Sequence, residues 1–141
     1  MANHVIPSLV FHHIGVQVKD FAREKDFFVN GLGLKPSTSW RNGEREILLL
    51  EMGNGGMIEL FSGGSEETAV NGRFIHFAMQ VDDVETAFNK AIAAGASCVR
   101  PVATVSVDSH PIRLTLQCGF VRTPGGADLE FFRVLKVNEE K

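Results

Sequence analysis

The amino-acid sequence predicts an α+β fold in which two tandem βαβββ modules form curved mixed sheets around a shared cleft. The first observation is a repeated order of elements, because one strand, one helix and three strands are predicted in each half of the chain. The second is a gapless alignment of residues 11–20 (FHHIGVQVKD) with residues 74–83 (FIHFAMQVDD), with five identities. The third is a later pair of segments in the same order, GGMIELF and GGADLEFF, with one extra residue in the second copy.

Length and composition limit the class of protein. The 141 residues fit a single domain over 1–141, with one module over about 10–62 and the other over about 73–135. The net charge of −3 offers no footprint for nucleic acid, and no apolar run reaches the roughly 18 residues of a membrane span. Cys98 and Cys118 are too few for a disulfide framework or a zinc ribbon. Without the features of a secretory signal, we expect a soluble, cytoplasmic protein that binds neither nucleic acid nor a membrane.

The first module begins with period-2 alternation over residues 11–18, which is typical of a strand. Asp20 is a candidate N-cap for a helix of about 10–12 residues that ends at Gly31 or Gly33. Four apolar side chains of this helix are expected to face a core: Phe21, Phe28, Val29 and Leu32. Three further strands are predicted, separated by Gly-containing turns: residues 35–40, 44–52 and 57–61.

A polar, Gly-rich loop at residues 62–72 separates the modules, and the order of elements then starts again. A strand at 74–81 leads to a helix at 84–94, whose apolar residues recur at i, i+3, i+4, i+7 and i+8. Three strands are predicted after it: 97–105, 112–122 and 128–134. Residues 138–141 are expected to be a frayed tail.

Strand periodicity places one histidine and one glutamate of each module on the sheet face opposite its helix. In the first strand of each module, His13 and His76 alternate with apolar residues that face the core. Glu59 and Glu130 likewise alternate with apolar neighbours in the last strand of each module. If the modules are related by an approximate twofold axis, these four groups converge in the cleft. His12 falls on the core-facing side and is expected to be structural.

Four such residues predict a divalent metal site. A carboxylate inside an apolar strand is costly unless it is paired or metal-bound, and two carboxylates would balance the charge of the cation. Open coordination positions would allow the metal to polarise a carbonyl, while a carboxylate moves a proton on the adjacent carbon. The sequence has no tyrosine, so this proton transfer falls to acidic residues or histidines. A lone histidine or glutamate in a strand is usually only structural or solvated; the matched positions in two repeats favour the metal.

Other side chains are weaker candidates for substrate contacts. Gln17 and Gln80 fall on the cleft face and could orient a substrate, or could only bond across the sheet. Arg113 and Arg122 could hold an anionic substrate, or could be solvated charges at the rim. The Gly-rich segment at 53–56 is not followed by Lys-Ser/Thr and a helix, which excludes a phosphate-binding loop, and no Gly-x-Ser-x-Gly motif is present.

These motifs resemble the vicinal oxygen chelate superfamily, which includes glyoxalase I, methylmalonyl-CoA epimerase and bleomycin resistance proteins. The resemblance covers about residues 10–134 and includes HIGVQVKD at 13–20, HFAMQVDD at 76–83 and TPGGADLE at 123–130. In glyoxalase I-like members, the matching positions bind nickel, zinc or cobalt, and one of the metal-bound glutamates is the base. The resemblance therefore implies His13, Glu59, His76 and Glu130 as ligands, with Glu59 or Glu130 as the catalytic base. It also implies a homodimer, with a metal site either within one chain or shared between two.

The sequence departs from bacterial glyoxalase I at the positions that bind glutathione. Gln17 stands where those enzymes carry an arginine, and Phe61-Ser-Gly-Gly stands where they carry an asparagine. We therefore expect a metal-dependent lyase or isomerase that acts on a small oxygenated carbonyl compound other than lactoylglutathione. The alternatives are a methylmalonyl-CoA epimerase-like enzyme, or a non-enzymatic protein that binds a small molecule and confers resistance.

Overall fold

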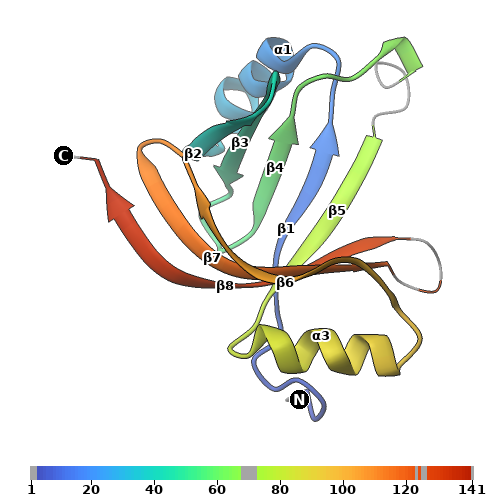
Figure 1. Ribbon diagram of the computed structural model, residues 1–141. Helices are drawn as coiled ribbons and strands as arrows, with labels where there is room; N and C mark the ends of the chain where they lie inside the picture. The colour runs from blue at the N-terminus through green and yellow to red at the C-terminus, as the bar shows by residue number, and fades with distance from the viewer. Residues whose placement is uncertain (1–2, 68–72, 123, 125–126, 141) are drawn as a thin grey trace.

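The computed structural model describes residues 3–67, 73–122, 124 and 127–140. In this part of the chain, eight strands form one mixed sheet that curls into an open half-barrel (Figure 1). The strands follow the order β2-β3-β4-β1-β5-β8-β7-β6. Their bounds are β1 Val10–Gln17, β2 Lys35–Asn42, β3 Arg45–Glu51, β4 Met57–Phe61, β5 Arg73–Gln80, β6 Ser97–Val107, β7 Ile112–Arg122 and β8 Asp128–Glu139. The α+β fold class is confirmed, with the predicted sheets joined into one.

The two halves of the sheet meet at β1 and β5, which pair antiparallel. In each half, the first strand also pairs parallel with the last one, β1 with β4 and β5 with β8. These four central strands therefore repeat the same pairing on both sides of the junction. Residues 68–72 of the predicted connecting loop lie outside the described residues.

The first helix begins as predicted but continues differently. The Asp20 carboxylate accepts a hydrogen bond from the Arg23 amide at 3.1 Å, which confirms the N-cap of helix α1 (Phe21–Asp26). A short π-helical segment, η1 (Phe27–Gly31), follows, and its wider turn bonds the Leu32 amide to the Phe27 carbonyl. Leu32 is 59% exposed, so the prediction that it packs in a core is wrong. The extra residue in the turn changes the direction in which the last side chains point.

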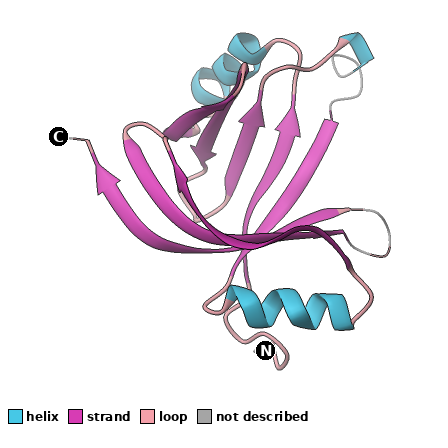
Figure 2. Ribbon diagram, viewed as in Figure 1, coloured by secondary structure: helices cyan, strands magenta, loops and turns pink. Residues whose placement is uncertain are grey.

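Helix α3 (Val84–Ala93) covers the outer face of the second half of the sheet (Figure 2). The Asp83 carboxylate caps it by accepting hydrogen bonds from the amide and hydroxyl of Thr86. A Cβ atom at Gly119 of β7 would lie 2.9 Å from the Phe88 ring, so this glycine allows the helix to pack closely on the strand. None of the helices in the described segments is long and apolar enough to cross a membrane.

Strand β8 extends beyond the end predicted from the sequence. Glu139 pairs with Ile112, and the Glu140 amide donates a hydrogen bond to the Pro111 carbonyl at 2.9 Å. The prediction that residues 138–140 fray is therefore wrong, because the long β7 strand offers backbone partners to its neighbour along its whole length. Residue 141 lies outside the described residues.

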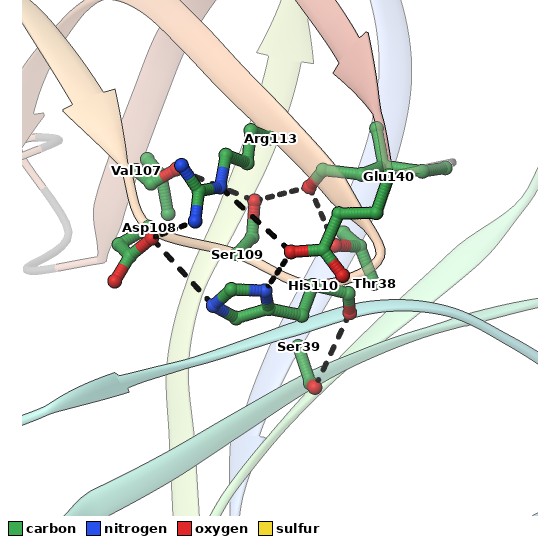
Figure 3. Close-up of polar contacts among 9 residues, drawn as sticks. Thr38, Ser39, Val107, Asp108, Ser109, His110, Arg113 and Glu140 are labelled. Atoms are coloured by element: carbon green, nitrogen blue, oxygen red, sulfur yellow. Dashed lines mark hydrogen bonds and ion pairs between the residues drawn. The ribbon is translucent and has the colours of Figure 1, made fainter.

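The turn between β6 and β7 closes one side of the half-barrel against β2. Ser39 and His110 exchange two backbone hydrogen bonds, and the Thr38 hydroxyl donates to the Ile112 carbonyl at 2.8 Å. Figure 3 shows that charged side chains also gather at this turn. The His110 ring lies between the carboxylates of Asp108 and Glu140. The same two carboxylates also face the Arg113 guanidinium.

Candidate metal centre

The four side chains predicted as metal ligands come from the four central strands: Glu59 (β4), His13 (β1), His76 (β5) and Glu130 (β8). Gly15 of β1 pairs with Glu59 on one side and with His76 on the other. A Cβ atom at Gly15 would lie 3.3 Å from the His76 imidazole and 3.2 Å from the Phe61 ring. The absence of a side chain at Gly15 therefore leaves room for the His76 imidazole above β1.

A second row of paired residues repeats this arrangement. Ala78 of β5 pairs with His13 of β1 and with Glu130 of β8. Ala78 is fully buried and follows Gly15 by 63 residues, the same spacing that separates His13 from His76. Each row therefore sets a histidine and a glutamate on either side of a small residue, and the sequence repeat becomes an approximate twofold relation within the site.

The polar atoms of the four side chains lie close together. The Nε2 atoms of His13 and His76 are 3.0 Å apart. The Glu59 carboxylate lies 3.4 Å from Nε2 of His13 and 3.5 Å from Nε2 of His76. The Glu130 carboxylate lies 3.8 Å and 3.3 Å from the same two nitrogens. Three of the residues, His13, Glu59 and His76, offer ligand atoms that all lie within 4.8 Å of one another.

Burial and mutual charge shift the pKa values of this cluster. Desolvation lowers the pKa of His13 to about 3, with further lowering by His76 and His12. Desolvation raises the pKa of Glu59 to about 8, although the charge of His76 opposes this shift. Desolvation also lowers the pKa of His76, but its hydrogen bond to Glu130 and the charges of the nearby carboxylates, Glu59, Glu130 and Asp128, outweigh it, so the net shift is upward. Protons and a cation would therefore compete for the centre.

This donor set fits a divalent transition-metal cation. Imidazole nitrogens and carboxylates are ligands of zinc, nickel and cobalt, and two carboxylates neutralise the charge of one such ion. All four side chains are at least nine-tenths buried, where an uncompensated charge is costly. Without a cation, the two imidazole nitrogens at 3.0 Å can form a hydrogen bond only if one carries a proton and the other does not.

His12 lines the cavity around the cluster, which corrects the prediction that it is a core-facing structural residue. A β-bulge between Phe11 and His13 breaks the period-2 alternation of β1 at this position. Nδ1 of His12 lies 2.9 Å from Nδ1 of His13, and its ring contacts Phe132 edge-on. This contact leaves Nε2 of His13 directed at the other ligands. The only signal in the sequence was the adjacency of two histidines, because periodicity does not reveal a bulge.

The cluster lies in a cavity of about 820 Å³ bounded by strands from both halves of the sheet. Most of its wall is apolar, with Ile47, Leu49, Leu114 and Leu116 among the lining residues. A cavity of this size holds a typical small organic ligand. Cys118 also lines it, and burial raises the pKa of this thiol to about 11, so it is protonated at neutral pH.

The two glutamines predicted as substrate contacts lie outside the cavity wall. Gln17 is buried, and its Nε2 donates a hydrogen bond to the Ser62 carbonyl at 3.1 Å. Gln80 is exposed at the end of β5. Of the two roles considered for Gln17, its contacts are those of a residue that bonds across the fold.

The two arginines predicted as substrate contacts also lie outside the cavity wall, and two other arginines line it. Arg113 and Arg122 are exposed and ion-paired with acidic side chains. Arg45 of β3 and Arg100 of β6 line the cavity. Arg45 lies two residues before Ile47, which places both side chains on the same face of β3. This spacing could have identified Arg45 as a cavity residue. Two register shifts in β6 flank Arg100, so strand periodicity could not have placed it.

Comparisons with known proteins agree with this architecture. The family model of the glyoxalase/bleomycin resistance protein/dioxygenase superfamily matches residues 10–131. The uncharacterized protein YwbC of Bacillus subtilis (strain 168) is 28% identical over 125 residues, which cover 86% of this chain and 94% of that protein.

The solved structures that share the fold include the following two. A hypothetical protein from Bacillus halodurans C-125 is 20% identical, with a TM-score of 0.69 over 95% of this chain and 99% of that one. The methylmalonyl-CoA epimerase of Mycobacterium tuberculosis is 17% identical, with a TM-score of 0.67 over 94% of this chain and 91% of that one. At these identities the likeness concerns the fold alone.

Proposed function

Because this chain belongs to the glyoxalase/bleomycin resistance protein/dioxygenase superfamily, we propose that it is a metal-dependent lyase or isomerase of the glyoxalase I type. It would move a proton on the carbon beside the carbonyl of a small oxygenated substrate. The observation that carries this proposal is the convergence of two histidines and two glutamates in one buried cluster inside a ligand-sized cavity.

The roles of the four side chains follow from their positions. His13, Glu59, His76 and Glu130 would hold a nickel, zinc or cobalt ion, and one chain supplies all four. When bound, such an ion supplies Lewis acidity that polarises a substrate carbonyl. The largely apolar wall of the cavity lowers the local dielectric constant and strengthens electrostatic interactions at the cluster.

Glu59 or Glu130 would accept the proton from the substrate carbon and return it to the neighbouring position. Both carboxylates approach the same two imidazole nitrogens from different strands, β4 and β8. A substrate between them would have one carboxylate on either side. Lactoylglutathione fits less well, because Gln17 bonds to the Ser62 carbonyl and does not line the cavity.

Solvent deuterium exchange tests the proposed reaction. Protein loaded with nickel, cobalt or zinc would be incubated in deuterated buffer with dihydroxyacetone, 2-oxobutanoate and methylmalonyl-CoA, and the substrates followed by NMR. We expect metal-dependent exchange of a proton next to a carbonyl. This exchange should be lost in at least one of the variants Glu59→Gln and Glu130→Gln, and it should be retained in a Glu67→Gln control.

The outcomes separate the candidate functions. Exchange confined to methylmalonyl-CoA favours the epimerase-like alternative, and exchange with the small ketones favours the lyase or isomerase. Tight binding of these compounds without any exchange would overturn the enzymatic proposal in favour of a binding protein.

A further inference from the structure

Two arginines face the cavity without acidic partners. Arg45 is half-buried and Arg100 is exposed, and both line the cavity wall. Among the residues that the structure describes, neither guanidinium lies within 4.0 Å of a carboxylate. This distinguishes them from Arg113 and Arg122, whose charges are already neutralised by ion pairs. An arginine that faces a small-molecule cavity without a counter-ion is available to bind an anionic ligand.

Each guanidinium stacks on a phenyl ring that adjoins the metal ligands. The Cζ atom of Arg45 lies 5.7 Å from the centroid of Phe61, and that of Arg100 lies 5.6 Å from the centroid of Phe120. Both phenyl rings meet the His76 imidazole edge-on, with centroid distances of 6.0 Å for Phe61 and 5.6 Å for Phe120. The two cations are therefore held one ring away from the ligand cluster, one in each half of the sheet.

The charge balance of the cavity favours an anion. Glu59 and Glu130 would neutralise a divalent cation, and Asp128 is paired with Arg122 at 2.9 Å. The charges of Arg45 and Arg100 then remain uncompensated, which leaves a net charge of about +2 facing the cavity. The rest of the wall is largely apolar, so it suits a hydrocarbon body better than a second polar group.

We propose that Arg45 and Arg100 form an anion-binding site, and that the substrate is a small organic anion with an apolar body. Its carboxylate or phosphate would bind one or both guanidiniums, while its reacting carbonyl faces the ligand cluster. The position of the carbonyl rests on the proposed function; the anion site itself rests only on the two arginine–phenylalanine pairs and their exposure to the cavity.

Binding of matched probes tests this site. Hexanoate and hexyl phosphate carry the two kinds of anion, and hexanamide has the same chain without a charge. Trp40, the only tryptophan, lines the same cavity, so its fluorescence can report binding alongside calorimetry. For the wild type, with and without zinc, we expect at least one of the anions to bind roughly tenfold or more tightly than hexanamide. The better anion identifies whether carboxylate or phosphate is preferred.

Variants of Arg45 and Arg100 test whether these two residues cause the preference for anions over hexanamide. Arg45→Gln and Arg100→Gln should each weaken it, and the double variant should abolish it, whereas Arg23→Gln on α1 should leave it intact. Arg45→Lys and Arg100→Lys keep the charge but lose planar stacking, so they should retain part of the preference and show that the fold is preserved. Equal affinity of the wild type for anions and amide, or a full preference in the double variant, would overturn the proposal.

The two proposals can fail separately. The anion preference is measured by binding and needs no turnover. If the preference is found but no substrate exchanges protons, only the proposed reaction is overturned. Conversely, proton exchange with neutral substrates and no anion preference would remove the anion site and leave the reaction in place.

Discussion

His12 sets the orientation of the His13 imidazole at the centre of the site. Its Nδ1 atom contacts Nδ1 of His13 at 2.9 Å, which leaves Nε2 of His13 toward the other three ligands. Partners of this kind fix the tautomer and the ring angle of a metal-binding histidine. If His13 binds a metal as proposed, His12 would act as a positioning residue without contributing a ligand atom to the cluster.

Replacing His12 tests this role. His12→Leu should lower the zinc affinity by roughly 10–100-fold, because the His13 ring loses the partner that orients it. His12→Asn, whose side chain places a polar atom near the position of Nδ1, should recover much of that loss. Competition with a chromophoric chelator measures both affinities, and an unchanged affinity in the leucine variant would show that His12 only fills space.

The raised pKa of Glu59 predicts a pH-dependent metal affinity. Burial raises the pKa of Glu59 from its ordinary value of 4.5 to about 8, so below pH 8 a cation that binds there must displace its proton. The apparent zinc affinity should then rise about tenfold per pH unit between about pH 6 and pH 8. The pKa of His76 is also raised, so its deprotonation should likewise increase the zinc affinity as the pH rises. His13, with its pKa lowered to about 3, is already neutral in this range.

Zinc titrations across this range measure the slope. Glu59→Gln should reduce it, since the variant has no proton to release at this position. A flat profile for the wild type would contradict the protonation of Glu59 in the metal-free centre.

The convergence of the four candidate ligand residues could be predicted from the sequence, because each member alternates with apolar residues and recurs in both repeats. Arg100 could not be predicted in this way, because it has no counterpart in the repeat and β6 is irregular around it. Arg45 has no counterpart either, and only its two-residue spacing from Ile47 marks the strand face on which it lies. The orientation of His12 depends on a bulge, which arises from pairing between β1 and β5 and not from the local sequence.

At the scale of elements, local signals predicted where strands and helices begin better than how they continue. The Asp20 and Asp83 caps lie where expected because an N-cap depends on a few adjacent residues. The π-helical segment η1 and the extended end of β8 depend on contacts with distant segments. The contact of the β6–β7 turn with β2 joins residues about 70 positions apart, beyond the reach of local patterns.

Thr38 provides a test of that long-range contact. Its hydroxyl is buried and donates to the Ile112 carbonyl at 2.8 Å, so Thr38→Val should lower the free energy of unfolding by about 1 kcal/mol. Ser39→Ala is a matched control, because the Ser39 hydroxyl lies 3.5 Å from its acceptor and should contribute less. Urea unfolding of both variants measures the difference. Equal stability of the two variants would mean that the turn does not depend on this hydrogen bond.

At the scale of the whole molecule, the curvature of one sheet brings the duplicated halves around a common cavity. The four proposed ligand residues come from β1, β4, β5 and β8, so one chain supplies all of them. The homodimer implied by the resemblance stays a prediction. If the chain does dimerise, dilution to monomers, followed by sedimentation velocity, should leave the zinc affinity unchanged.

We propose above that this duplicated cluster binds one divalent cation. Metal analysis of untagged protein, purified without chelator and reconstituted with zinc, nickel or cobalt, tests it most directly. We expect about one equivalent per chain for the wild type and for the control His4→Ala, whose histidine is exposed near the N-terminus. We expect much less metal in His13→Ala and in His76→Ala. Well below one equivalent in the wild type, or an unchanged content in His76→Ala, would contradict the proposal.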